Sequence, residues 1–295
     1  MTYSYAYSYA RIERLHYHSY LTYYIFRRSK CFGDRFIGVL SDFLESKLNV
    51  SNIKNLMRDV IHSSLILHDI GKAYKGYQRV VHELYGEASF GYHEILSSII
   101  TYSYLRSYVT TRIRALNIDG DVKKRLRDYL TLPASIAVLM HHEALRNYVD
   151  ILTKLRYEMS KFLRVVVKEG FIEGEVLLID RILESLGIKD VKLSDVINQL
   201  ISRGFQRRYD GIREYFMIYS RNPDVEYLAT NITAAIQLCD RLAASITRGG
   251  LNRSLRRLEH EFINYCLSPG DASINEFLTR IGDEAARELR NIISK

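Results

Sequence analysis

The stretch SSLILHDIGKAYKGYQ, residues 63–78, places a histidine and an aspartate side by side at the end of an apolar run. Upstream of this pair, seven residues have the i, i+3, i+4, i+7 spacing of one buried helix face: Ile53, Leu56, Met57, Val60, Ile61, Ser64 and Leu67. Ser51 is a candidate N-cap for this helix and Gly71 a candidate stop. His68 and Asp69 could therefore cap the helix, stabilise a core or bind a metal ion.

Helical periodicity extends over almost the whole chain. The pattern predicts a helix that begins with Pro133 near its first turn, and another that begins with the cap Asn222 and ends at Gly249 and Gly250. Two more helices are expected near 251–266 and 272–293. The chain has only three prolines and 16 glycines, which favours long helices over many short strands. The sequence predicts an all-α fold with at most one short hairpin.

Two segments are less regular. Residues 165–180, VVVKEGFIEGEVLLID, combine β-branched runs with two glycines and suit a loop or a short hairpin. Residues 3–10, YSYAYSYA, alternate aromatic and small side chains over eight positions. That short segment fits a strand, a frayed end or a first helical turn, and the pattern does not choose among them.

The composition is that of a folded soluble protein: 295 residues, 47% hydrophobic and 26% charged. Its longest uncharged stretches fall short of the roughly 20 apolar residues of a spanning helix, and the N-terminus lacks a signal-peptide pattern. We expect a cytoplasmic protein with no membrane association. The net charge of +8 favours an anionic partner.

The three cysteines, Cys31, Cys239 and Cys266, are far apart and form no CxxC pair. Neither a thiolate zinc site nor a disulfide framework is indicated, so we interpret them as buried hydrophobic residues.

The nine histidines divide into two sets. His62, His82 and His260 stand alone, and a lone histidine is usually a hydrogen-bonded structural residue. The others lie beside or within apolar helical runs, as Asp240 does: His16, His18, His68, His93, His141 and His142. Burying each of these groups separately would be costly, whereas imidazole nitrogens and carboxylate oxygens that converge are natural ligands for divalent cations. Adjacent residues diverge by about 100° on a helix, so a pair such as His141 and His142 can reach two neighbouring ions, or one ion and a residue that supports its ligands.

The order of these motifs resembles the HD superfamily of metal-dependent phosphohydrolases. HDIGKAYKGYQ (68–78) is similar to the HD-G-K…FQ segment of the HD nuclease in type I CRISPR interference, and YHEILSS (92–98) resembles its HE-x-x-SA segment. MHHEA (140–144) resembles its HHG segment, and LCDRLAAS (238–245) its AD-x-x-AS segment. Tyr77, Glu143 and Cys239 depart from the family pattern without removing a ligand.

The resemblance implies one HD nuclease domain over residues 1–295. Its fold would be a helical bundle with peripheral helices, in which the core covers about residues 12–250 and a C-terminal helical extension covers residues 251–295. It implies one or two divalent ions (Mn, Ni, Co, Fe or Mg) that share Asp69. By this resemblance His18, His68 and Asp240 complete one site, and His93, His141 and His142 the other. His16 remains an alternative to His18, although Leu15 and Thr22 fit the family's L-x-x-H-x-x-x-T around His18.

The expected catalytic residues are Asp69 and Lys72. If the helix continued, Lys72 would lie on the same side as His68 and could neutralise a phosphate oxygen; otherwise it is a solvated surface residue. Glu94 and Glu143 are candidates only for supporting the ligands, and Gln78 and Ser98 match family positions without an evident role.

Two basic segments suggest a polynucleotide substrate. One lies between the HE and HH motifs and could flank the metal site; the other interleaves arginines with aromatic residues. The candidate nucleic-acid contacts are Arg106, Arg112, Arg114, Lys123, Lys124, Arg125, Arg127, Arg203, Arg207 and Arg208. The alternative for either segment is an ordinary charged helix face.

These residues, taken with the resemblance, predict a metal-dependent nuclease that cleaves single-stranded DNA, with RNA left open, in CRISPR antiviral interference. The chain has no GxxxxGK[ST] phosphate loop, so the resemblance implies a separate helicase subunit and recruitment to a crRNA-guided surveillance complex. Two alternatives are an HD phosphohydrolase acting on nucleotides or cyclic nucleotides, and a metal-binding docking subunit without catalysis.

Overall fold

The fold is all-α, as predicted from the periodicity. The computed structural model describes residues 5–7, 13–84, 90–142, 156–205, 209, 210, 214, 221–247 and 257–294. The helices are α1 (Leu15–Arg28), α2 (Gly33–Leu48), α3 (Lys54–Leu67), the 3₁₀ helix η1 (Ile70–Ala73), α4 (Lys75–Leu84), α5 (His93–Arg114), α6 (Gly120–Met140), α8 (Arg156–Glu169), α9 (Glu173–Ser185), α10 (Leu193–Arg203), α12 (Pro223–Thr247), α13 (Arg257–Phe262), the π-helix η3 (Ile263–Leu267) and α14 (Ile274–Ile293). Strands β1 (Tyr5–Tyr7) and β2 (Glu13–Arg14) form one antiparallel pair, so part of the 3–10 segment is a strand.

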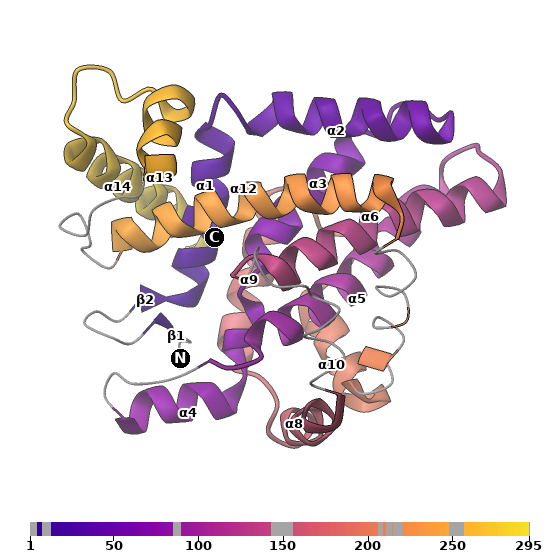
Figure 1. Cartoon of the computed structure of the whole chain (residues 1–295). Helices are drawn as coiled ribbons and strands as arrows, with labels where there is room; N and C mark the ends of the chain where they lie inside the picture. The colour runs from indigo at the N-terminus through magenta and orange to yellow at the C-terminus, as the bar shows by residue number, and fades with distance from the viewer. Residues whose placement is uncertain are drawn as a thin grey trace.

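The centre of the molecule is the long hairpin of α5 and α6, with α12 packed on α6 and α1 packed against α12 and α3 (Figure 1). Ser98 on α5 donates to the carbonyl of Ser135 on α6 (2.8 Å), and Arg106 lies opposite Asp128, which fixes the antiparallel register. The buried apolar residues form one cluster that extends from Leu15 in α1 to Leu289 in α14. None of the described helices combines the length and apolar character needed to cross a membrane.

Several helix starts follow from capping chemistry. The predicted cap Asn222 is confirmed, since its Oδ1 accepts from the amides of Asp224 and Val225. The predicted C-terminal helix begins with a capping box between Ser273 and Glu276.

Pro133 does not begin a helix; it lies inside α6. The helix starts 13 residues earlier, where the Asp119 side chain accepts from the amides of Asp121 and Val122. A proline inside a helix removes one backbone hydrogen bond, and here the packing of α6 between α5 and α12 offsets that loss. The predicted continuation of this helix beyond Met140 falls largely on 143–155, which lie outside the described residues.

The loop or hairpin expected at 165–180 is also wrong. The β-branched residues 165–167 belong to α8, where Val166 is fully buried, and only residues 170–172 separate α8 from α9. Gly170 adopts a left-handed conformation (φ 73°), and its amide donates to the Val166 carbonyl, which ends α8. Burial of an apolar helix face has outweighed local strand propensity.

The interpretation of the cysteines as buried hydrophobic residues holds for Cys239, which is buried and free. Cys266 is buried but disulfide-bonded, and Cys31 is exposed. Cys31 and Cys266 form a disulfide between the α1–α2 connection and η3, across 235 residues of sequence. Spacing could not reveal this pair, because only the tertiary fold brings the two segments together.

The predicted boundaries of α3 shift by a few residues. The helix begins at Lys54 rather than next to Ser51, and it ends at Leu67, four residues before Gly71. Gly71 lies in η1, which packs against the start of α5 so closely that a Cβ atom would lie 2.3 Å from the His93 carbonyl oxygen and 2.9 Å from Leu96 Cβ. Gly71 is therefore required for close packing of two chain segments.

Replacing Gly71 with alanine should destabilise the protein by roughly 1–3 kcal/mol, because backbone atoms of α5 would have to move. Gly120→Ala is the matched control, since a Cβ atom there meets nothing within 4 Å at the first turn of α6. Chemical denaturation of the two variants and the wild type measures the difference. Equal stability of Gly71→Ala and Gly120→Ala would contradict the packing argument.

Candidate metal centre

The seven predicted metal ligands converge. His18 comes from α1, His68 and Asp69 from the end of α3, His93 from the start of α5, His141 and His142 from the residues after α6, and Asp240 from α12. Their ligand atoms form two groups, each within 4.8 Å: Asp69, His93, His141 and His142 in one, and His18, His68, Asp69 and Asp240 in the other. Each group could hold a metal ion. The division between the groups is the one the sequence predicted.

Asp69 belongs to both groups, and each of its carboxylate oxygens faces one of them. Oδ1 lies 3.2 Å from His93 Nε2, 3.5 Å from His141 Nε2 and 3.8 Å from His142 Nε2. Oδ2 lies 3.5 Å from His68 Nε2 and 3.6 Å from His18 Nε2. Ligands around one ion with bonds of about 2.1 Å lie about 3–4 Å apart, so these spacings suit shared coordination by a bridging carboxylate.

Helix termini orient three of the imidazoles. His68 and His141 are the C-cap residues of α3 and α6, and their Nδ1 atoms bond the carbonyls of Leu65 (2.8 Å) and Val138 (2.6 Å). These carbonyls belong to the last helical turn, which leaves acceptors without helical partners. His93 bonds the Phe90 carbonyl in the same way (2.6 Å). A carbonyl accepts only, so Nδ1 carries the proton and Nε2 presents a lone pair.

The Nε2 atoms of His68, His93 and His141 are buried and have no hydrogen-bond partner among the described residues, and neither has Asp69 Oδ1. A buried polar atom without a partner costs free energy, and four such atoms facing one another are unusual in a native fold. A cation in the group of Asp69, His93, His141 and His142 would satisfy three of these atoms, and a cation in the other group would satisfy His68 Nε2. The donor set of imidazole nitrogens and carboxylate oxygens suits transition metals such as Mn, Fe, Co or Ni, and zinc.

Asp240 completes the second group. Its Oδ1 lies 2.7 Å from His18 Nε2 and 3.6 Å from His68 Nε2. Burial alone would raise the pKa of Asp240, but the neighbouring His18 and His68 imidazoles hold it well below its usual value. The carboxylate is therefore ionised at neutral pH.

Asp69 is ionised as well. Burial opposes its charge, but Lys72, His68 and the other imidazoles hold the pKa of Asp69 well below its usual value. Burial lowers the pKa of His68, whereas the nearby Asp69 carboxylate raises the pKa of His141 against the effect of burial. With neutral imidazoles, the two carboxylates and the Lys72 ammonium sum to −1, which favours a cation at this position.

Lys72 is not a surface residue. It is buried in η1, its Nζ donates to Asp69 Oδ2 (2.7 Å), and it lies 5.6 Å from the centre of the Phe90 ring. α3 does not continue to Lys72 as the sequence suggested; the 3₁₀ turn brings it to Asp69 instead. The ammonium competes with a cation for the same carboxylate oxygen.

The turn that carries Asp69 and Lys72 is fixed by residues whose roles the sequence did not reveal. Gln78 Nε2 donates to the Lys72 carbonyl (2.6 Å), and Ser97 Oγ accepts from the Gly71 amide (2.9 Å). Ser98 joins α5 to α6 just beyond the site. Gln78 and Ser98 stood out only by resemblance. Ser97 lies in the YHEILSS segment but was not singled out, and Phe90 gave no signal in the sequence.

The structure distinguishes His16 from His18. His16 points away from the cluster, and both its backbone amide (2.6 Å) and its Nδ1 (3.0 Å) contact Glu175 Oε1 of α9. His62 packs among Tyr23 and Phe26 and belongs to neither candidate group. His260 is exposed on α13, and the side chain of His82 lies outside the described residues.

The basic segment between the HE and HH motifs does not flank the cluster. The hairpin of α5 and α6 has its cluster end at His93 and His141. Arg106 lies 13 residues from His93 and Arg127 lies 14 residues from His141, about 20 Å along their helices.

Several of these cations are already paired: Arg106 and Arg127 with Asp128, and Arg112 with Asp190. Arg114, Lys124 and Arg125 are exposed near the far end, and the Lys123 ammonium there donates to the Arg114 carbonyl. Arg203 is exposed at the end of α10, and Arg207 and Arg208 lie outside the described residues.

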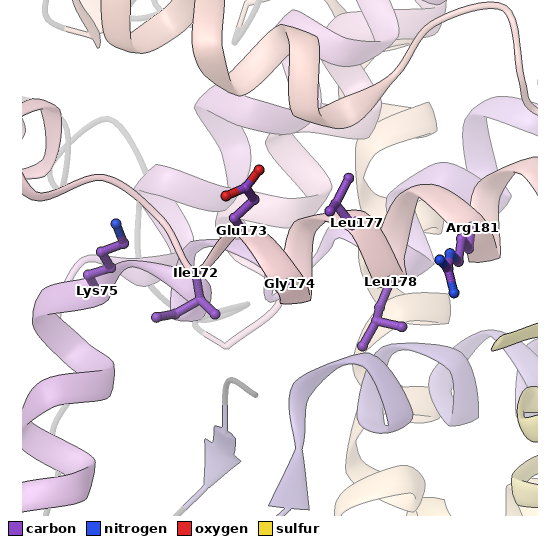
Figure 2. Close-up of a pocket in the computed structure, with 7 residues that line it drawn as sticks. All are labelled: Lys75, Ile172, Glu173, Gly174, Leu177, Leu178 and Arg181. Carbon is purple, nitrogen blue, oxygen red and sulfur yellow. The ribbon is translucent and has the colours of Figure 1, made fainter. Parts of the chain in front are cut away.

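A pocket of about 420 Å³ lies along α9, away from the seven candidate ligands. Figure 2 shows Ile172 and Leu178 on one side of α9, Glu173 and Leu177 on the other, and Lys75 and Arg181 towards its two ends. None of the predicted site residues lines it.

No protein-family model, curated protein or solved structure matches this chain. The candidate site therefore stands on its geometry.

We expect the metal-free protein to bind two divalent ions with unequal exchange rates. The group with Asp240 is buried throughout, whereas His142 is 34% exposed and opens the other group to solvent. His18→Ala and His142→Ala should each leave about one ion per chain, and Asp69→Ala should weaken both sites. His18→Ala should retain the ion beside the exposed His142, and His142→Ala should retain the ion in the buried group. A chelator should therefore remove the ion from His18→Ala faster than from His142→Ala.

Mn²⁺ or Co²⁺ titration followed by metal analysis measures these stoichiometries. His260→Ala is the matched control, since His260 is exposed on α13 and belongs to neither candidate group. Full occupancy in His18→Ala would contradict the assignment of His18.

Proposed function

We propose that this chain is a metal-dependent hydrolase of phosphodiester bonds. The observation that carries the proposal is the buried Asp69 carboxylate, with one oxygen facing each of two sets of imidazole nitrogens. When bound, a pair of divalent ions supplies Lewis acidity toward water and toward the oxygens of a phosphate group. Two cations held by one bridging carboxylate suit the attack of water on a phosphodiester, which needs charge neutralised on both the attacking and leaving oxygens.

The protein's own residues would divide the work. Asp69 would hold the cations through its carboxylate oxygens. His68, His93 and His141 would hold them through Nε2, because their Nδ1 atoms are tied to backbone carbonyls. Lys72 is held 2.7 Å from Asp69 Oδ2 and would be displaced from that oxygen by a cation. Its ammonium would then be available to a phosphate oxygen at the same site.

We further propose that the substrate is a single-stranded polynucleotide, DNA first and RNA second. The net charge of +8 favours a polyanion. The resemblance of the five ordered motifs to the HD nuclease of type I CRISPR interference gives the proposal its context, with a separate helicase and a crRNA-guided complex as partners. A polynucleotide path would reach the cluster from the side of His142, the one ligand with substantial exposure.

A second candidate is hydrolysis of nucleotides or cyclic nucleotides. The burial of the other six ligands favours it, because a small phosphate ester needs less room than a strand. Activity on mononucleotides without activity on oligonucleotides would establish this candidate in place of the first.

Asp69→Asn and His68→Ala should each reduce metal-dependent cleavage of end-labelled single-stranded DNA by at least about 100-fold, because they remove ligands of the ions. His260→Ala should retain wild-type cleavage. Circular dichroism verifies that the variants fold, and parallel assays with double-stranded DNA, RNA and mononucleotides define the substrate. Undiminished cleavage by folded Asp69→Asn would overturn the proposal, and absence of cleavage in the metal-loaded wild type would favour a docking subunit.

Lys72→Met should separate metal binding from catalysis. Loss of the ammonium removes a competitor for Asp69, so Mn²⁺ affinity should be unchanged or higher, while the cleavage rate should fall by about 10-fold or more as phosphate neutralisation is lost. Lys72→Arg should restore part of the rate. A Lys72→Met protein that cleaves at the wild-type rate would show that this residue only stabilises the metal-free cluster.

A further inference from the structure

The Cys31–Cys266 disulfide lies next to the helix that supplies His18. Cys31 is three residues beyond the end of α1, and Cys266 lies in η3, just before α14. The Cα atoms are 5.1 Å apart, within the range that a disulfide spans without backbone movement. The bond therefore joins the end of α1 to the C-terminal part of the chain.

The two segments are also held together by contacts that do not involve sulfur. The Lys30 amide donates to the Cys266 carbonyl (2.7 Å), and the Lys30 ammonium donates to Ser268 Oγ (3.0 Å). The rings of Phe32 and Phe262 lie 5.3 Å apart. These contacts keep the two thiols together after reduction, so the bond can reform without a search through the unfolded chain.

α14 continues this attachment along α1. Arg27 makes a two-pronged ion pair with Glu288 (2.7 and 2.8 Å), and the hydroxyl of Tyr17 donates to the Gly282 carbonyl (3.0 Å). Tyr24 donates to Glu284 (2.9 Å). These α1 residues lie on one side of the helix, while His18 faces the metal cluster. The C-terminal segment thus supports α1 from outside.

We propose that Cys31–Cys266 is a redox-responsive link that fastens the C-terminal segment, α13 to α14, to the ligand-bearing helix α1. Cys31 is exposed, so an external thiol or disulfide has access to that end of the bond. In oxidation, a small-molecule or protein disulfide accepts two electrons from the two cysteine thiols and leaves as two thiols, as the chain's S–S bond forms. Cys239 takes no part, since it is buried and burial holds its pKa well above the usual value.

The link is tested on the full-length chain, purified without reductant and with thiols alkylated at once. Peptide mapping by mass spectrometry should find Cys31 joined to Cys266, and Cys239 alkylated only after denaturation. Reduction should lower the melting temperature by roughly 5–10 °C, because closing so long a loop restricts the unfolded chain. Backbone amide exchange in α13, η3 and α14 should become faster on reduction, while α5 and α6 should not change.

Three variants make the outcome specific. Cys31→Ser and Cys266→Ser should show the reduced melting temperature with or without reductant, and Cys239→Ala should keep the wild-type response. Unlinked Cys31 and Cys266 in the folded, air-oxidised wild type would overturn the proposal. An equal effect of reductant on wild type and Cys31→Ser would overturn it as well.

Discussion

The structure depends on a carboxylate that no water reaches. Asp69 is fully buried, and its charge is opposed inside the protein by one ammonium, that of Lys72. Asp240 adds a second carboxylate within the same set of imidazoles. Hydrophobic packing can assemble α1, α3, α5, α6 and α12 around this point, but it cannot compensate an excess negative charge. A bound cation could, so metal binding would stabilise the same arrangement as folding.

Helix termini make this arrangement possible. A helix ends with carbonyls that lack internal partners, and a histidine at the C-cap satisfies one of them through Nδ1. The same bond turns Nε2 outward, beyond the end of the helix. His68 and His141 use it at the ends of α3 and α6, so the local chemistry that terminates two helices also sets the orientation of two metal ligands. The C-terminal ends of both helix dipoles favour a cation there.

The convergence of the candidate ligands could be predicted because its signals are local: charged or imidazole side chains beside apolar helical runs, in the order on which the resemblance rests. What surrounds them could not. The conformation of the Asp69–Lys72 turn depends on Gln78 and Ser97, and the Cys31–Cys266 bond depends on residues 235 positions apart. Residues 165–180 were mistaken for a loop or hairpin because strand propensity is weaker than burial of a helix face. The all-α class followed from periodicity, a property of each segment alone.

The peripheral helices belong to the site as much as the ligands do. α1 contributes a single ligand, His18, yet it is fixed at both ends by elements that contribute none. At its start, Glu175 of α9 accepts the His16 amide and thereby caps α1 from another helix. At its end, Arg27 pairs with Glu288 of α14. A buried imidazole misplaced by 1 Å could not share an ion with Asp69 and Asp240, so the precision of the candidate centre depends on contacts made outside it.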